Sequence, residues 1–388
     1  MKTFARSAAL VLAFLAVAPV ARAQDDLPGA VVTSLAPLGA DQESLLKKFA
    51  EENLARLTSD KPADVRRGRS ALLKPLGDPS VSVSFRLAYA RTLVEPLAAL
   101  AASDKDPVAV SALRVLGDLA TDSAVAPLER GLSSPRPAVR IASASALGRV
   151  LETASLRTPA LTADRGVRLI AALGERLASE SEPLVADALA RALVLGLASP
   201  QQGLEAVPSA AMSRLSSVVG TRVQGARASK AEGEAEASLT HTLILRAGEG
   251  LRTALADRPQ AFQAQAIKDA AGFAGDVLAL QRRRLVGADI PAILPREDDE
   301  AVQETKKAQR EKPGVQVATA ESVLYFARQA LAPVAERPSI PSTNLAQFIR
   351  AASTEQDARF DTSALDLIGA SGVLTRAPFE IPASRFGK

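Results

Sequence analysis

The most constraining feature of the sequence is a helical unit that occurs twice in succession within residues 106–150. Gly117 in the first copy corresponds to Gly148 in the second, 31 residues further on. The same offset aligns three apolar pairs: Leu116 with Leu147, Val110 with Ile141, and Val108 with Val139. A fixed offset of this size is typical of a stacked-repeat fold, in which each copy supplies one helix–turn–helix unit.

Each copy carries an apolar face at helical spacing. The first face consists of Val108, Ala112, Val115 and Leu119, and the second of Ile141, Ala144, Leu147 and Leu151. Ala142, Ala144 and Ala146 keep the second helix thin, so that a neighbouring helix can approach closely. Because neither helix can bury its apolar face alone, we predict an all-α fold, an α-solenoid of stacked antiparallel helix pairs. The alternative is an irregular helical domain with one chance duplication.

This stretch resembles the HEAT-repeat family, particularly its short bacterial form. The residues that carry the resemblance are Asp106-Pro107, Pro137-Ala138-Val139-Arg140, Ala144, Ala146, Leu147 and Gly148. The resemblance is clear over residues 78–197 and weak elsewhere, and it implies an extended surface that binds a protein or peptide. Ala109 stands where the next copy has Arg140, which interrupts the Asp/Arg ladder that the family often has.

The first residues have the pattern of a bacterial secretory signal. Lys2 and Arg6 precede an apolar run over residues 8–18, and Ala21-Arg22-Ala23 forms a small-x-small cleavage site. We therefore expect residues 1–23 to be removed and the chain to be exported to the periplasm or the cell exterior. The apolar run is shorter than the roughly 20 residues that span a bilayer, so no integral membrane segment is expected afterwards. The absence of cysteine excludes disulfides and thiolate metal sites.

The net charge of +4 gives little reason to expect nucleic-acid binding. Lys2, Arg6 and Arg22 leave with the signal, which contains no acidic residue, and the remaining chain is close to neutral. A mixed, near-neutral surface attracts phosphate weakly. The local clusters Arg282-Arg283-Arg284 and Arg66-Arg67-Gly68-Arg69 are therefore interpreted as solvated helix faces.

Six segments are expected along the chain. They are the signal at 1–23, an irregular lead-in at 24–40, HEAT-like repeats at 41–198, an irregular helical region at 199–295, a charged linker or helix at 296–314, and a C-terminal helical region with a loose tail at 315–388. After residue 150 the offset grows to 46, which predicts an insertion at 156–164. Residues 222–238 are polar and small, and we expect a mobile loop or frayed helix there. Pro313-Gly314 is expected to end the charged segment.

Few residues suggest chemistry. His241 is the only histidine, and no serine lies in the Gly-x-Ser-x-Gly pattern of a nucleophile elbow. One histidine without cysteine does not make a zinc site, and Asp298-Asp299-Glu300 does not match a calcium loop. We therefore expect no catalytic residue, no cofactor and no metal. The absence of tryptophan and the presence of only two tyrosines argue against sugar or base stacking.

These observations favour an exported, non-enzymatic binding or scaffold protein of the cell envelope with a protein or peptide partner. By analogy with other solenoids, the binding surface is expected to include Arg114, Asp118, Arg140, Ser143 and Arg149. One alternative is a hydrolase on a helical scaffold, with a carboxylate or His241 site in the C-terminal half. Another is a structural envelope protein that assembles with itself.

Overall fold

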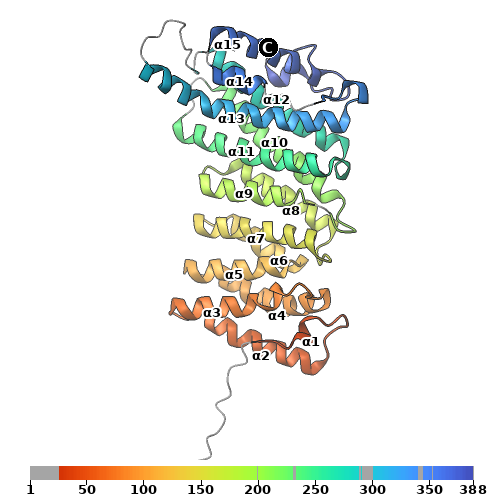
Figure 1. Ribbon diagram of the computed structural model, residues 1–388. Helices are drawn as coiled ribbons and strands as arrows, with labels where there is room; N and C mark the ends of the chain where they lie inside the picture. The colour runs from red at the N-terminus through yellow and green to blue at the C-terminus, as the bar shows by residue number, and fades with distance from the viewer. Residues whose placement is uncertain are drawn as a thin grey trace, which may run out of the picture.

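The computed structural model describes residues 26–198, 200–229, 233–287, 290, 300–339, 344–351 and 353–387. In these ranges the chain forms α-helices joined by short turns, and no β-strand occurs. The longer helices are α2 (Ala40–Leu57), α3 (Pro62–Leu73), α4 (Val83–Ala101), α5 (Asp106–Leu119), α6 (Asp122–Leu132), α7 (Pro137–Leu156), α8 (Ala163–Ser179), α9 (Pro183–Leu195), α10 (Ala206–Ala228), α11 (Glu234–Asp257), α12 (Ala264–Val286), α13 (Glu300–Leu331), α14 (Asn344–Ala351) and α15 (Thr354–Ile368). None of these described helices is both long and apolar enough to cross a membrane. The prediction of an all-α solenoid is confirmed (Figure 1).

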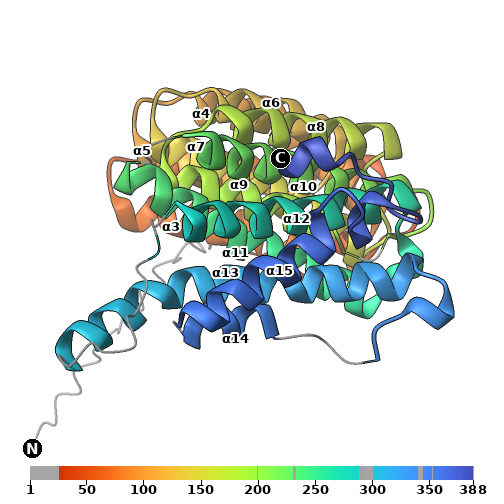
Figure 2. The ribbon, with the colours of Figure 1, turned by 90° about the horizontal axis from the view of Figure 1, so that it is seen from above.

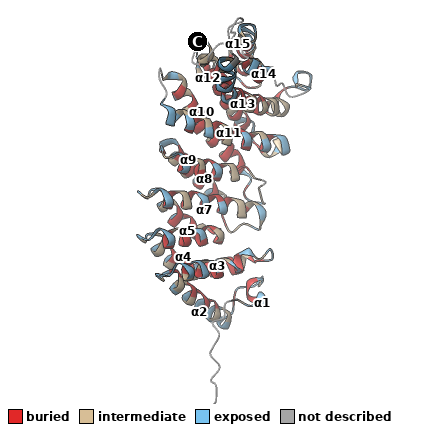
Figure 3. Cartoon of the chain, turned by 60° about the vertical axis from the view of Figure 1, so that its left-hand side comes forward, coloured by how far each residue is buried: buried red, intermediate tan, exposed pale blue. Residues whose placement is uncertain are grey.

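The helices stack in two layers (Figure 1). Layer A consists of α2, α4, α6, α8, α10 and α12, and layer B of α3, α5, α7, α9, α11 and α13; each helix contacts the next one in its own layer. Buried side chains concentrate where neighbouring helices meet, and one continuous hydrophobic core extends from Val31 to Phe386 (Figure 3). Each helix thus buries its apolar face only through its neighbours, as in other repeat proteins.

Consecutive layer-B helices run in the same direction. Asp106 at the start of α5 pairs with Arg136, which precedes α7, at 2.8 Å. Towards the other end, Asp118 of α5 pairs with Arg149 of α7 at 3.4 Å. Because both ends of α5 lie beside the corresponding ends of α7, the two helices are adjacent and parallel.

Small residues bring these helices together. A Cβ atom on Gly117 would lie 2.8 Å from the Cα of Ala146, and a Cβ atom on Gly148 would lie 3.3 Å from the Cβ of Ala192. Ala146 and Ala192 are separated by the offset of 46 residues, so one glycine–alanine contact recurs at two successive interfaces. At the following interface the glycine is supplied by α11, where a Cβ atom on Gly250 would lie 2.7 Å from Val194.

Ion pairs also link the starts of the layer-B helices. Lys105 pairs with Asp60 at 2.6 Å between α3 and α5, and Arg140 pairs with Glu180 at 3.0 Å between α7 and α9. Together with the pair between Arg136 and Asp106, they form a series across three interfaces. The sequence indicated an interruption at Ala109, but residues just before the helices supply the missing pairs.

The second half of the stack is more regular than expected. Of the segment expected as a mobile loop or a frayed helix, residues 222–228 lie in α10 and residues 234–238 in α11, and Val223, Ala226 and the following Leu239 are buried in the core. Pro313 and Gly314 do not end a helix but lie inside α13. A Cβ atom on Gly314 would lie 2.8 Å from the Arg350 side chain, so this glycine lets α14 approach α13 closely. Residues 291–299, which include most of the Asp298-Asp299-Glu300 run, lie outside the described residues, as does the predicted signal at 1–23.

Three further details concern the helix boundaries. α4 begins at Val83 with Ser82 as its N-cap. α7 extends to Leu156, and the insertion predicted at 156–164 lies at the connection from there to α8. α15, which the sequence pattern did not indicate, lies with α14 at the C-terminal end of the stack (Figure 2).

The C-terminal tail is packed rather than loose. Phe379, Ile381 and Phe386 are buried. A Cβ atom on Gly275 of α12 would lie 2.4 Å from the ring of Phe386, so the tail fits directly against the helix backbone. The tail therefore covers α12, the last helix of layer A, as the terminal cap of a solenoid does.

Candidate binding surfaces

The five residues predicted to share a binding surface divide into two groups. Arg114 and Arg149 are exposed on α5 and α7, and Asp118 is half-buried beside Arg149. Burial raises the pKa of Asp118, although the positive charges of Arg149 and Arg114 oppose this shift. These three residues lie on one face of layer B, and their role in binding stays a prediction.

Arg140 and Ser143 do not belong to that surface, which corrects the expectation. Arg140 is buried and donates to Glu180 and to the Ser134 carbonyl, so it ties α7 to the turn before α9. Ser143 is buried against α6, where a Cβ atom on Gly131 would lie 2.0 Å from its hydroxyl. Both side chains therefore take part in contacts between helices.

Glu180 is the acidic centre of this contact. Burial raises its pKa, but hydrogen bonds from the Glu182 backbone N–H and from Arg176 and Arg140 outweigh that effect, and the pKa falls below its ordinary value. Arg176 Nη2 lies 2.7 Å from Glu180 Oε2. These hydrogen bonds join α7, α8 and the turn before α9, so the buried Glu180 carboxylate is a structural joint between helices.

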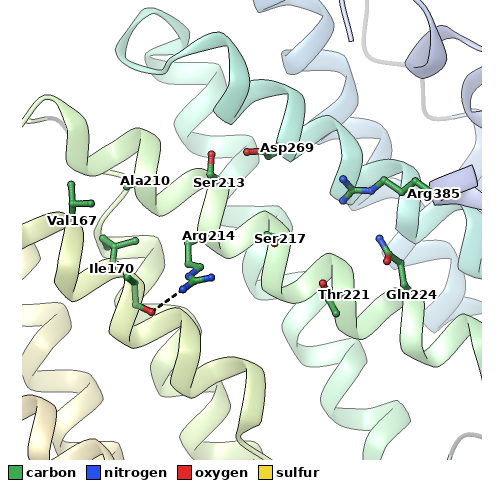
Figure 4. A pocket seen from close by; sticks show the side chains of 11 residues that line it. Val167, Ile170, Ala210, Ser213, Arg214, Ser217, Thr221, Gln224, Asp269 and Arg385 are labelled. Carbon is green, nitrogen blue, oxygen red and sulfur yellow. Dashed lines mark hydrogen bonds between the residues drawn. The ribbon is translucent and has the colours of Figure 1, made fainter. Parts of the chain in front are cut away.

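A groove of about 500 Å³ follows α10 between α8 and α12 (Figure 4). Val167 and Ile170 make its α8 side apolar, and Arg385 lies at the opposite end. Along α10, the lining side chains Ser213, Ser217, Thr221 and Gln224 follow at intervals of four, four and three residues. This spacing places them on one face of the helix.

The hydroxyls of this row are available to a ligand. Within the described part of the chain, those of Ser213, Ser217 and Thr221 make no hydrogen bond to protein. Beside them, Arg214 Nη2 lies 3.4 Å from both the Ala171 carbonyl and Glu175 Oε1. The side chain of Arg214 crosses α8 where Gly174 leaves room, since a Cβ atom there would lie 2.3 Å from it. The groove therefore offers neutral hydrogen-bonding groups beside a cation.

Behind Gln224 and Arg385, at one end of the groove, lies Asp276. This carboxylate is fully buried in α12, 2.8 Å from Arg385 Nη2 and 3.1 Å from Gln224 Nε2. Burial raises the pKa of Asp276, although Arg385 and Gln224 favour its charged form. Sequence reasoning missed the groove, although the Ser213–Gln224 spacing is a helical polar row visible in the sequence.

His241 lies in a different place and has an amide as its partner. Gln316 Nε2 donates to its Nδ1 at 2.9 Å. Burial lowers the pKa of His241, and Lys312 and Arg284 lower it further. No serine or carboxylate is therefore aligned on Nδ1. Among the described residues, no group of three acidic or histidine side chains is placed to hold a metal ion.

The family model for HEAT repeats matches residues 94–194, from α4 to the end of α9. Residues 94–194 are therefore similar to HEAT repeats. HEAT repeats and related helical repeats are typical of protein-interaction scaffolds. Curated proteins gave no significant match.

Several solved structures resemble the chain. An engineered protein is 18% identical, with a TM-score of 0.37, covering 72% of this chain and 97% of its own. A second engineered protein is 15% identical, with a TM-score of 0.30 and 92% coverage of both chains. A computationally designed armadillo repeat protein for modular peptide recognition is 15% identical, with a TM-score of 0.28, covering 67% and 98%.

Proposed function

We propose that this protein is an exported, non-enzymatic binding scaffold of the bacterial cell envelope that holds an extended segment of a partner protein in the groove along α10. The row of free hydroxyls on α10 carries this proposal. Export rests on the signal-like pattern of residues 1–23, and an enzymatic role finds no support in the surroundings of His241.

The spacing of the hydroxyl row suits an extended chain. Side chains four residues apart on a helix are separated by about 6 Å along its axis. Equivalent groups two residues apart in an extended peptide repeat at about 6.6 Å. Ser213, Ser217 and Thr221 therefore match alternate backbone groups of a peptide that runs along α10, and the distance from Ala210 to Gln224, about 21 Å, accommodates about six residues.

The groove's chemistry also suits a peptide better than a small ligand. It is open along its length, and its hydroxyls and amide bind backbone groups without requiring a particular charge. The apolar side formed by Val167 and Ile170 receives the alternate side chains that point away from α10.

Blocking the groove is expected to weaken peptide binding. Peptides from a random library are selected on the wild-type chain and measured on Ser217→Trp, whose indole fills the middle of the groove. We expect at least a tenfold loss of affinity, about 1.4 kcal/mol. The matched control is Ser179→Trp, at the exposed end of α8 outside the groove. Failure to enrich any peptide, or equal affinity for both variants, would contradict the proposal.

A further inference from the structure

At the end of the groove where Arg385 lies, a seat holds the arginine side chain. Its floor is the Asp276 carboxylate, which has no exposed surface and is held in place by Gln224. Arg385 donates to this carboxylate from Nε and Nη2 and keeps about a quarter of its side chain exposed to the groove. A fully buried carboxylate facing a planar cation favours arginine over lysine.

Three glycines shape the seat. A Cβ atom on Gly220 of α10 would lie 2.8 Å from Asp276 Oδ2, and one on Gly272 of α12 would lie 2.8 Å from Arg385 Cζ. On Gly275, one helical turn further, it would strike the ring of Phe386. Glycine has a low helix propensity, so these residues reduce the local stability of α10 and α12. In return they leave room for an arginine followed by an aromatic ring.

The segment that fills the seat is attached to it by side chains. The backbone hydrogen bonds made by the described residues 376–387 stay within the C-terminal tail. Its further polar links to α10 and α12 are a hydrogen bond from Arg227 Nη2 to the Arg385 carbonyl, at 2.8 Å, and an exposed pair between Lys268 and Glu380, at 3.4 Å. Its apolar contacts come from the buried side chains of Phe379, Ile381 and Phe386. Another segment with the same two side chains can therefore take its place without breaking a backbone ladder.

We propose that Arg385 and Phe386 are a tethered occupant of the Asp276 seat, and that the partner segment carries an arginine followed by an aromatic residue which takes the seat in exchange. This inference rests on the proposed function, because the same partner segment then continues along the hydroxyl row of α10. The tail thereby sets a threshold: a segment that also uses the row displaces it at a lower concentration than a segment that uses the seat alone.

The test uses a labelled peptide with the sequence of residues 382–388, Pro-Ala-Ser-Arg-Phe-Gly-Lys, and the full chain. The variant Arg385→Ala is expected to bind this peptide at least tenfold more tightly than the wild type, because its seat is vacated. Adding Asp276→Asn should remove that gain, whereas adding Asp269→Asn should leave it unchanged. Asp269 is the matched control, since it lines the same groove and bonds Gln265 instead of Arg385.

A second measurement needs no variant. Hydrogen exchange of the wild-type chain is followed with and without excess peptide, and amides 383–387 are expected to exchange faster when the peptide is present. Equal affinity of the wild type and Arg385→Ala, binding that survives Asp276→Asn, or unchanged exchange would each overturn the inference. A peptide whose arginine is replaced by alanine should show no effect.

The two proposals fail in different ways. Ser217→Trp blocks the row but leaves the Asp276 seat intact. The short tail peptide should therefore still bind the double variant Arg385→Ala/Ser217→Trp. If library peptides lose affinity on Ser217→Trp yet do not require Asp276, the proposed function stands and the exchange of Arg385 is refuted. If only the tail peptide binds, the seat exists but the groove is not the partner site.

Discussion

Replacing Arg140 by alanine is expected to lower the free energy of unfolding at pH 7 by about 3 kcal/mol, the lower end of the range for breaking a buried ion pair. The variant leaves Glu180 buried with one arginine, Arg176, and also removes hydrogen bonds to the Ser134 and Pro135 carbonyls. Urea titration of both chains measures the loss.

The loss should depend on pH. Because the folded-state pKa of Glu180 is lowered, its contribution to stability is present above its ordinary pKa of 4.5 and is lost as the pH falls through the folded value. The difference between wild type and Arg140→Ala should therefore shrink below pH 4.5. Arg359→Ala is the control, since its pair with Glu355 is exposed and contributes at most about 0.5 kcal/mol. A loss at pH 7 no larger than that of the control would refute the structural role of Arg140.

Replacing Arg385 by alanine is expected to lower stability by about 3 kcal/mol at pH 7, because Asp276 stays buried without its cation. Burial already raises the folded-state pKa of Asp276 above its ordinary value of 3.8, and removing Arg385 raises it further. A carboxyl group whose pKa is higher in the folded state than in the unfolded state lowers the free energy of unfolding at pH values above its folded-state pKa. This loss disappears as the pH falls and Asp276 takes up a proton. Thermal unfolding from pH 4 to pH 8 should show the deficit growing with pH.

The control for Arg385 is Lys268→Ala. It removes the other ion pair of the tail, between Lys268 and Glu380, which is exposed and 3.4 Å long. Its effect should stay below about 1 kcal/mol at every pH. If Arg385→Ala behaves like Lys268→Ala, Asp276 does not depend on the tail.

The repeat was predictable because its signal is local. Gly117 and Gly148 occupy corresponding positions 31 residues apart, and Ala146 lies two residues before Gly148. In the structure α5 and α7 meet through Gly117 and Ala146. The sequence also led to errors where tertiary contacts override local preference. Pro313 and Gly314 stand inside a helix that α14 covers. Residues 222–228 and 234–238, expected as a mobile loop or a frayed helix, lie in α10 and α11, where Val223 and Ala226 are buried.

The candidate site was harder to predict. Arg140 and Ser143 were predicted to be surface residues. The family analogy indicates which face of a helix a residue lies on, but not where the neighbouring helix covers that face. Arg385 and Asp276 are separated by 109 residues, and neither stands in a motif. The hydroxyl row on α10 is visible as a helical spacing in the sequence. It lines a groove only because α8 and α12 flank α10, and the fold alone determines how far these helices lie from the row.

The central claim is that consecutive layer-B helices stack through small residues that face one another. It is tested most directly by the double variant Gly148→Cys/Ala192→Cys, in a chain that contains no other cysteine. The two Cβ positions are 3.3 Å apart, near the roughly 3.5–4.5 Å of disulfides. We predict that mild oxidation removes both thiols by an intramolecular bond. The pair Gly148→Cys/Arg191→Cys, whose second position faces solvent, should keep them. Free thiols in the first pair, or equal cross-linking in both, would contradict the stacked arrangement.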